Sequence, residues 1–332
     1  MKKTTIYDVA KRAGCSTATV SMVLKNSDRI TSERKKHVIK VIEEMNYIPN
    51  HFAQGLNTKR NMAIGLVVPD MENPVFSKMI TGVEEYVDKK GYRLILGVCN
   101  HNRDKEAVYL DLIHNNHVDG MIVFPTFLDN TKKIIDDWEA SEFPVVLCGL
   151  SFEDSSISYV KCDSRMGAYM ATDHLIERGR RKIAFIAPVF EKSMADTRIN
   201  GYMDALRVNG IDFDESLTVY CQQSFDSVYE AAKDLLNDAK PDSIVCLYDY
   251  IAIPVMRAAS ELGLKIPEDI SVIGYDNIDV SGYLPVALST VETQSVRIGE
   301  LAAEIMVNKI NGTICKHDQI VLQPKLIIRE ST

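Results

Sequence analysis

Several features that mark secreted, membrane or metal-binding proteins are missing from this chain of 332 residues. Its seven cysteines are scattered and none forms a C-x-x-C pair, which argues against a zinc site or a thioredoxin-like redox centre. The first seven residues contain no apolar run, so we expect no signal peptide. No window approaches the roughly 18 apolar residues that cross a membrane. We therefore expect a protein of the reducing cytoplasm.

The motifs of common enzymes are missing as well. No G-x-G-x-x-G follows the first expected strand, and the sequence has no Walker motif, nucleophile elbow or H-E-x-x-H. We interpret His114, His117 and His174 as surface or core residues and not as metal ligands. The sequence thus predicts a protein that is not an enzyme and has no cofactor and no metal.

Charge is unevenly distributed along an otherwise ordinary composition of 46% apolar and 25% charged residues. Residues 1–60 contain 12 Lys and Arg against 5 Asp and Glu, a net charge of +7. The remainder of the chain has a net charge of −15. A basic end on an acidic protein predicts that this end binds a polyanion.

The basic end carries a helix-turn-helix pattern. Thr5 and Asp8 have the spacing of a capping box at the start of a first helix. Gly14 supplies the turn, and Ser16 can cap a second helix. In this arrangement the second helix enters the major groove of DNA, whereas the alternative is an ordinary helical hairpin. Apolar residues at helical spacing would form the core: Ile6, Val9, Ala10, Ala13, Val20, Val23 and Leu24.

Four short runs in this region carry a more specific resemblance. In them the sequence resembles the LacI/GalR family of bacterial transcription regulators, and landmarks of the family continue through the whole chain. The runs are Thr5-Ile6-Tyr7-Asp8-Val9-Ala10, Ala13-Gly14, Thr19-Val20-Ser21 and Tyr47-Ile48-Pro49-Asn50. The resemblance implies DNA contacts at Thr5, Tyr7, Ser16, Thr17, Ala18, Ser21, Met22, Asn50 and Leu56.

The family has a short hinge helix that Asn50 would open here, with its counterpart at 51–58. An isolated helix of this length is marginal in water and Gly55 weakens it further, so we expect it to fold on DNA. Leu56 matches the family's hinge leucine, which in a dimer inserts into the minor groove and kinks the duplex. The alternative is that Leu56 packs against the core domain.

Met22 departs from the family pattern. Many relatives have an arginine at this position, and arginine can read guanine with two hydrogen bonds. Methionine donates none, so contact with a thymine methyl group is more plausible. The small residues Thr17 and Ala18 are the other positions expected to face bases. The operator should therefore differ from the common palindrome of the family.

From residue 61 onward, short apolar runs alternate with amphipathic helices. Regular β-α alternation predicts parallel sheets covered on both faces, and the pattern restarts near residue 182. We expect an α/β fold with two doubly wound subdomains behind an all-α headpiece, which the resemblance identifies as periplasmic-binding-protein-like. Strands are expected at 63–68, 93–98, 120–124, 144–148, 182–187, 217–221, 243–247 and 271–275, and helices at 74–90, 105–115, 166–178, 197–209, 227–237 and 251–262.

The expected domains follow from this division. Residues 1–49 form the helix-turn-helix domain, 50–60 the hinge and linker, and 61–332 the effector-binding and dimerisation core. Family resemblance implies three crossings between the subdomains, near 161–163, 288–293 and 323–325. The N-subdomain would then comprise about 61–160 and 292–322, and the C-subdomain about 163–290 and 324–332.

A ligand cleft is expected where the strands of the core end. Arg198 and Asp276 match effector-contacting positions of the family, and Phe76 and Phe225 match positions where an aromatic residue lines the pocket. Tyr248 and Asp249 follow a strand, with Tyr248 in place of a common asparagine. Arginine and carboxylate groups suit a hydroxylated effector such as a sugar. Alternatively, Arg198 and Asp276 pair only with each other and the aromatic residues belong to the core.

These patterns predict a homodimeric repressor that binds palindromic operator DNA under the control of a small, carbohydrate-like effector. Two alternatives stay open. One is a solute-binding protein without DNA regulation, which the basic headpiece disfavours. The other is a regulator whose co-effector is a protein.

Overall fold

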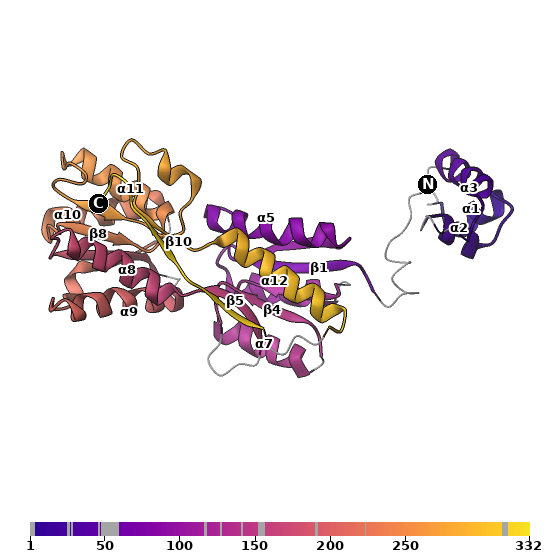
Figure 1. The fold of residues 1–332 in the computed structure, drawn as a ribbon, viewed down its shortest axis with the longest axis horizontal. Coiled ribbons are helices and arrows are strands. Elements are labelled where there is room, and N and C mark those ends of the chain that lie inside the picture. The colour runs from indigo at the N-terminus through magenta and orange to yellow at the C-terminus, as the bar shows by residue number, and fades with distance from the viewer. Residues whose placement is uncertain are drawn as a thin grey trace. The chain divides into compact units, whose positions relative to one another are not determined.

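The computed structural model of the chain describes most of its length in two compact units, Met1–Asn61 and Met62–Thr332, which we treat separately (Figure 1). Within them, the described residues are 4–24, 27, 29–45, 47, 60–115, 118–126, 128–140, 142–151, 157–189, 192–222, 224–313 and 318–332.

The first unit, the headpiece, contains the two predicted helices, α1 (Ile6–Arg12) and α2 (Thr17–Leu24), and a third helix, α3 (Ser32–Glu44). The capping box is present, because the Thr5 N–H donates to the Asp8 carboxylate at 2.9 Å and the Asp8 N–H donates to the Thr5 hydroxyl at 3.4 Å. Gly14 has a φ of +60°, the left-handed conformation that the turn requires. Val9, Val20 and Val38, one from each helix, are buried together and fix the angle between the helices.

In the second unit, the N-subdomain contains a six-stranded parallel sheet with the order β11-β5-β4-β3-β1-β2. The side chains of β1 alternate between the two faces: Ile64 and Leu66 pack under α5 and α12, whereas Ala63 and Val67 pack under α6 and α7. Burial of both faces explains the continuous apolar run of this strand. The elements are β1 (Ala63–Val68), α5 (Pro74–Lys89), β2 (Arg93–Val98), α6 (Arg103–Asn115), β3 (Gly120–Val123), α7 (Leu128–Ala140), β4 (Val145–Cys148), β5 (Ser158–Cys162), α12 (Ser295–Ile310) and β11 (Gln319–Leu322).

The C-subdomain repeats this plan with a four-stranded parallel sheet in the order β7-β6-β8-β9. Helices α8 and α9 pack together, as do α10 and α11 (Figure 1). Two short strands, β10 and β12, pair antiparallel beside the sheet. The elements are α8 (Ser164–Glu177), β6 (Ile183–Pro188), α9 (Lys192–Val208), the 3-10 helix η2 (Glu215–Leu217), β7 (Thr218–Cys221), α10 (Phe225–Asp238), β8 (Ser243–Cys246), α11 (Asp249–Glu261), β9 (Ser271–Ile273), the 3-10 helix η3 (Asp279–Gly282), β10 (Thr290–Glu292) and β12 (Lys325–Ile327).

Three chain segments connect the subdomains. They lie between β5 and α8, between β10 and α12, and between β11 and β12. These are the segments in which the family resemblance implies crossings. The predicted fold class, an all-α headpiece with two doubly wound parallel-sheet subdomains, is confirmed. Within the described ranges, no helix has both the length and the apolar character that a bilayer crossing requires.

Close packing of α5 against α12 depends on two glycines. A β-carbon at Gly82 would collide with the carbonyl oxygen of Val296, and one at Gly299 would collide with that of Met79. The two helix backbones therefore touch directly at this crossing. The contact fixes the position of α5, whose first turns line the cleft described below.

We predict that Gly82→Ala lowers the free energy of unfolding by about 1–3 kcal/mol, because the added methyl group forces the two helix backbones apart. Urea unfolding of the full-length protein measures the effect. Gly282→Ala is the matched control, since a β-carbon there would lie 3.7 Å from the nearest atom, Nε of Arg329. Equal stability of the two variants would contradict direct backbone contact between α5 and α12.

Candidate functional site

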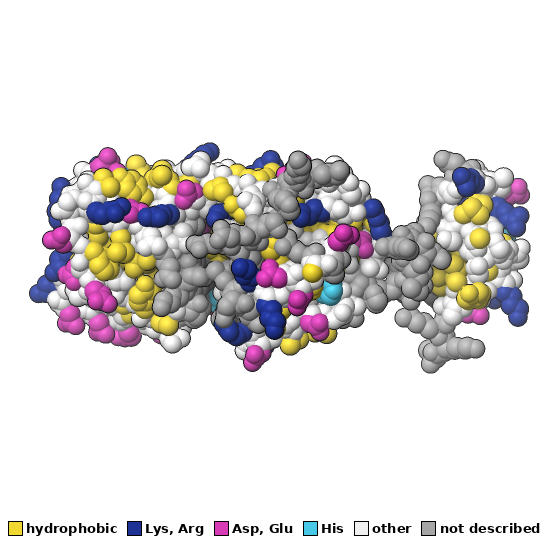
Figure 2. All heavy atoms as spheres, turned by 90° about the horizontal axis from the view of Figure 1, so that it is seen from below, with side chains coloured by type: hydrophobic (Ala, Val, Ile, Leu, Met, Phe, Trp, Pro, Cys, Tyr) yellow, Lys and Arg dark blue, Asp and Glu magenta, His cyan; other side chains and the backbone are white. Residues whose placement is uncertain are grey.

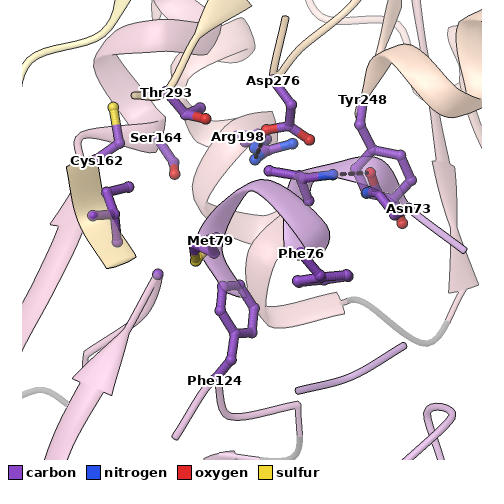
Figure 3. Close-up of a pocket in the computed structure, with 13 residues that line it drawn as sticks. Asn73, Phe76, Met79, Phe124, Cys162, Ser164, Arg198, Tyr248, Asp276 and Thr293 are labelled. Atoms are coloured by element: carbon purple, nitrogen blue, oxygen red, sulfur yellow. Dashed lines mark hydrogen bonds and ion pairs between the residues drawn. The ribbon is translucent and has the colours of Figure 1, made fainter. Parts of the chain in front are cut away.

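A pocket lies in the cleft between the two core subdomains (Figure 3). It encloses about 470 Å³ of empty space, part of it open to solvent. Much of its lining follows the carboxyl ends of strands, where loops of both parallel sheets face the cleft. The lining residues are Asn73, Val75, Phe76, Met79, Phe124, Gly149, Cys162, Ser164, Arg198, Tyr248, Asp276, Thr293 and Ile298.

The N-subdomain wall of the pocket is apolar and aromatic. Phe76 and Phe124 meet edge to face, with ring centroids 4.9 Å apart. Met79 lies beside them in Figure 3, and its sulfur accepts from the Cys148 thiol at 3.3 Å. Helix α5 presents this wall because Asn73 caps it, accepting from the Val75 N–H at 3.1 Å. This wall can cover the apolar face of a ring.

The C-subdomain wall is charged. The Arg198 side chain is 6% exposed, and its guanidinium lies 3.4 Å from the Asp276 carboxylate. It also donates to the Leu247 carbonyl and lies over the Tyr275 ring, 3.7 Å from the centroid. Nε of Arg198 is buried and has no hydrogen-bond partner among the described residues. A buried donor without a partner is uncommon in folded proteins.

Asp276 is held in an unusual conformation. Its φ is +97° and that of Asn277 is +49°, and each such residue costs on the order of 1–3 kcal/mol. The Asp276 N–H donates to the Val291 carbonyl at 2.8 Å, which helps to hold the turn. Burial raises the pKa of Asp276, and the Arg198 guanidinium opposes that rise. The pair therefore offers fixed donors and acceptors to hydroxyl groups in the cleft.

On the headpiece, helix α2 has one buried and one accessible side. Val20 and Val23 are buried, whereas Ala18 is exposed and Met22 is partly exposed. Tyr7 on α1 is 74% exposed. In Figure 2, Lys and Arg side chains are visible on the surface of this unit. An accessible, basic surface of this kind suits a DNA backbone.

Comparison with known proteins decides the family. Residues 5–50 match bacterial regulatory proteins of the lacI family, and residues 172–332 match a periplasmic binding protein-like domain. The chain is 33% identical to the HTH-type transcriptional repressor PurR of Vibrio atlanticus (strain LGP32), over 98% of each chain. The chain belongs to the LacI family. It is also 30% identical to the ribose operon repressor of Haemophilus influenzae, again over 98% of each chain.

The fold agrees with that of a solved LacI-family structure. The lac repressor dimer bound to operator and the anti-inducer ONPF superposes with a TM-score of 0.88 over 99% of each chain, at 23% identity. This LacI-family chain is thus a DNA-binding transcriptional regulator with a ligand-binding core. Membership of a regulatory family argues against a solute-binding protein without DNA regulation.

The structure brings four of the six expected effector-contacting residues together: Phe76, Arg198, Tyr248 and Asp276 all line the pocket. It does not bring Asp249 or Phe225 into the lining. Asp249 is fully buried and its carboxylate is turned away to accept hydrogen bonds from the protein itself. Phe225 begins α10, is 40% exposed, and pairs with the ring of Tyr250 at 4.5 Å.

Several lining residues were missed from the sequence. Their position in the sequence could have identified them, because most of these residues follow the carboxyl end of a strand or begin the helix after it. The lining residues that were not expected are Asn73, Val75, Met79, Phe124, Gly149, Cys162, Ser164, Thr293 and Ile298.

The expected DNA-contacting residues fall into two groups. Thr5, Tyr7, Ser16 and Ala18 are exposed, and Thr17, Ser21 and Met22 are partly exposed, so all seven lie on accessible parts of α1, the turn and α2. Asn50 and Leu56 lie outside the described residues.

We predict that Arg198→Met raises the pKa of Asp276 further, because the guanidinium is the group that most favours its ionised form. NMR titration of the carboxyl carbon measures the shift. Arg207→Met is the control, since Arg207 lies on the same helix but is exposed and pairs with Asp204. An unchanged titration of Asp276 in the Arg198 variant would show that the two groups do not interact.

Proposed function

We propose that the chain is a homodimeric transcriptional repressor whose affinity for a palindromic operator is set by a hydroxylated, carbohydrate-like effector in the cleft. The observation that supports a carbohydrate-like effector is the charged Arg198–Asp276 pair, which lies opposite the aromatic rings of Phe76 and Phe124. Nε of Arg198 is buried and lacks a hydrogen-bond partner among the described residues. A sugar ring combines an apolar face with a rim of hydroxyl groups, which matches the two walls. The name of the relative from Haemophilus influenzae, a ribose operon repressor, supports this class.

In this proposal each side chain has a distinct role. Phe76 covers one face of the ring. The planar guanidinium of Arg198 donates hydrogen bonds to hydroxyl groups of the effector, and the Asp276 carboxylate accepts hydrogen bonds from them. Tyr248 offers a second ring at the pocket margin, where a common asparagine would have offered an amide.

DNA recognition is assigned to the headpiece. Thr17, Ala18 and Met22 on α2 would face bases, whereas Thr5, Tyr7, Ser16 and Ser21 would contact the backbone. Two headpieces of a dimer would read two half-sites related by symmetry. Asn50 would open the hinge helix, and Leu56 would enter the minor groove beside its counterpart.

Control follows from linkage. An effector shifts the balance between two subdomain arrangements only by the difference in its affinity for them. One arrangement would let the two hinges meet on DNA and the other would not. The proposed role is regulatory and not catalytic, and its place is the cytoplasm, where chromosomal DNA lies.

The primary test is selection of bound genomic fragments by the full-length protein, followed by a salt series on the enriched site. A repressor that contacts phosphates enriches discrete palindromic sites and binds them more weakly as salt rises. Uniform recovery of fragments would contradict the proposal.

We predict that Met22→Arg shifts base preference toward guanine by about 1–3 kcal/mol at one position of each half-site, because arginine can donate two hydrogen bonds to that base. Selection from randomised duplexes measures it. Met22→Leu keeps an apolar side chain and should retain the original preference. An identical selected motif for all three proteins would show that residue 22 does not face a base.

We predict that Arg198→Ala abolishes the response to effector and leaves operator binding without effector within about twofold, because Arg198 lies in the cleft and not on the headpiece. Operator titrations with pooled carbohydrates, then with single sugars, measure the response. The matched control is Arg207→Ala, on the exposed face of α9. A normal response in the Arg198 variant would remove this residue from the effector site.

A further inference from the structure

Asp249 occupies a position directly behind the pocket. It is the first residue of α11 and follows Tyr248, which lines the cleft. Its side chain is fully buried, and its backbone N–H donates to the Tyr275 carbonyl at 2.8 Å. The residue thus lies between the carboxyl ends of β8 and β9, one layer beneath the pocket wall.

The Asp249 carboxylate accepts three hydrogen bonds from other parts of the chain. Oδ2 accepts from the Ile278 N–H at 3.0 Å and from the Ser281 hydroxyl at 2.6 Å. Oδ1 accepts from the Thr290 hydroxyl at 2.6 Å. A β-carbon at residue 274 would overlap this carboxylate, so Gly274 permits the close approach. One side chain therefore joins α11, the segment 276–281 and β10.

The segment 276–281 needs such support because of its backbone. Asp276 and Asn277 both have positive φ, a conformation that L-residues with side chains rarely adopt. The Asn277 N–H donates to the hydroxyl of Thr290 at 3.2 Å, so this threonine bonds both to the segment and to Asp249. Arg329 adds a hydrogen bond to the Asn277 side chain at 2.6 Å.

The same segment carries two features of the cleft. Asp276 faces Arg198 in the pocket. Lys78, which belongs to α5 of the other subdomain, donates to the Asn277 carbonyl at 2.9 Å and pairs with Asp279 at 2.7 Å. The position of segment 276–281 therefore determines where the Asp276 carboxylate lies in the pocket. It also determines whether Lys78 can contact Asn277 and Asp279 across the cleft.

We propose that Asp249 is a positioning residue whose carboxylate holds segment 276–281, so that Asp276 faces the pocket and Lys78 can reach Asn277 and Asp279. The proposal rests on the proposed function, because Asp276 is the group that would meet the effector. Asp249 itself does not touch the pocket.

Protonation of the Asp249 carboxylate should weaken its hydrogen bonds to segment 276–281 and Thr290. Burial raises the pKa of Asp249 to about 7, the nearby Asp276 charge acts in the same direction, and the hydroxyls of Ser281 and Thr290 oppose it. Three donors suit the ionised carboxylate, whereas the protonated form, populated below about pH 7, must donate one hydrogen bond itself. The charged or titratable groups around Asp249 and the segment are Lys78, Arg198, Cys246, Tyr275, Asp276, Asp279, Glu292 and Arg329.

Amide hydrogen exchange of the full-length protein tests the proposal without effector or DNA. At pH 8, Asp249→Asn should raise the exchange of 276–281 about tenfold over the wild type, with β6 and β8 unchanged. After correction for intrinsic rates, the wild type should lose protection in this segment between pH 8 and pH 6, whereas the variant should not change. Asp242→Asn is the matched control, since Asp242 precedes β8 at its opposite end and accepts from the Arg181 and Lys182 N–H groups at 2.7 and 3.0 Å.

The proposal would be overturned if segment 276–281 were as well protected in Asp249→Asn as in the wild type. It would also be overturned if the variant lost protection equally throughout the C-subdomain. If Asp249→Asn does not fold, Ser281→Ala removes one donor to the carboxylate and should raise exchange in the same segment by a smaller factor. Thr290→Val removes a donor to Asp249 and also the acceptor of the Asn277 N–H, and should raise it more than Ser281→Ala does. Unchanged exchange in both would also overturn it. Since no effector enters these measurements, their failure is distinct from a failure of the sugar titrations with Arg198→Ala.

Discussion

The ligand cleft of this regulator is organised around a buried ion pair between Arg198 and Asp276. Removing both charges from water is expensive, and attraction between them offsets that cost only if the remaining hydrogen-bonding groups are also satisfied. The Leu247 carbonyl and the Tyr275 ring hold the guanidinium, but its buried Nε finds no partner among the described residues. The two side chains line the cleft, where a ligand can meet their accessible polar atoms. This arrangement favours a site that is completed by a ligand.

The two walls of the cleft belong to different subdomains, so the affinity of a ligand that touches both walls depends on how the subdomains are arranged. Three connecting segments limit their relative motion, and Lys78 adds a polar contact at the margin of the pocket. Helix α5 carries part of the apolar wall and packs closely against α12 at Gly82 and Gly299. The effector can act on DNA binding only through the free-energy difference between such arrangements.

Much of this organisation could be predicted from the sequence. The capping box at Thr5 and Asp8 and the strands with continuous apolar runs are local patterns, and the structure confirms them. Strands β5 and β10–β12 were not predicted, because they have three to five residues each and mix polar with apolar side chains. The family resemblance placed Arg198 and Asp276 in one cleft, but position after a strand cannot give the direction of a side chain. Asp249 and Asp276 stand at the same distance after their strands, β8 and β9. The Asp249 carboxylate nevertheless turns inward, because Ser281 and Thr290, far away in sequence, supply its donors.

The most direct test of the account is a reciprocal pair of equilibrium titrations on the full-length protein. One measures affinity for a selected operator with and without saturating effector, and the other measures affinity for the effector with and without operator. We expect both affinities to change by the same factor, on the order of 5- to 150-fold, since coupling between two sites is reciprocal. Operator affinity that stays the same with the cleft filled and empty, or no preference for any site over bulk DNA, would contradict it.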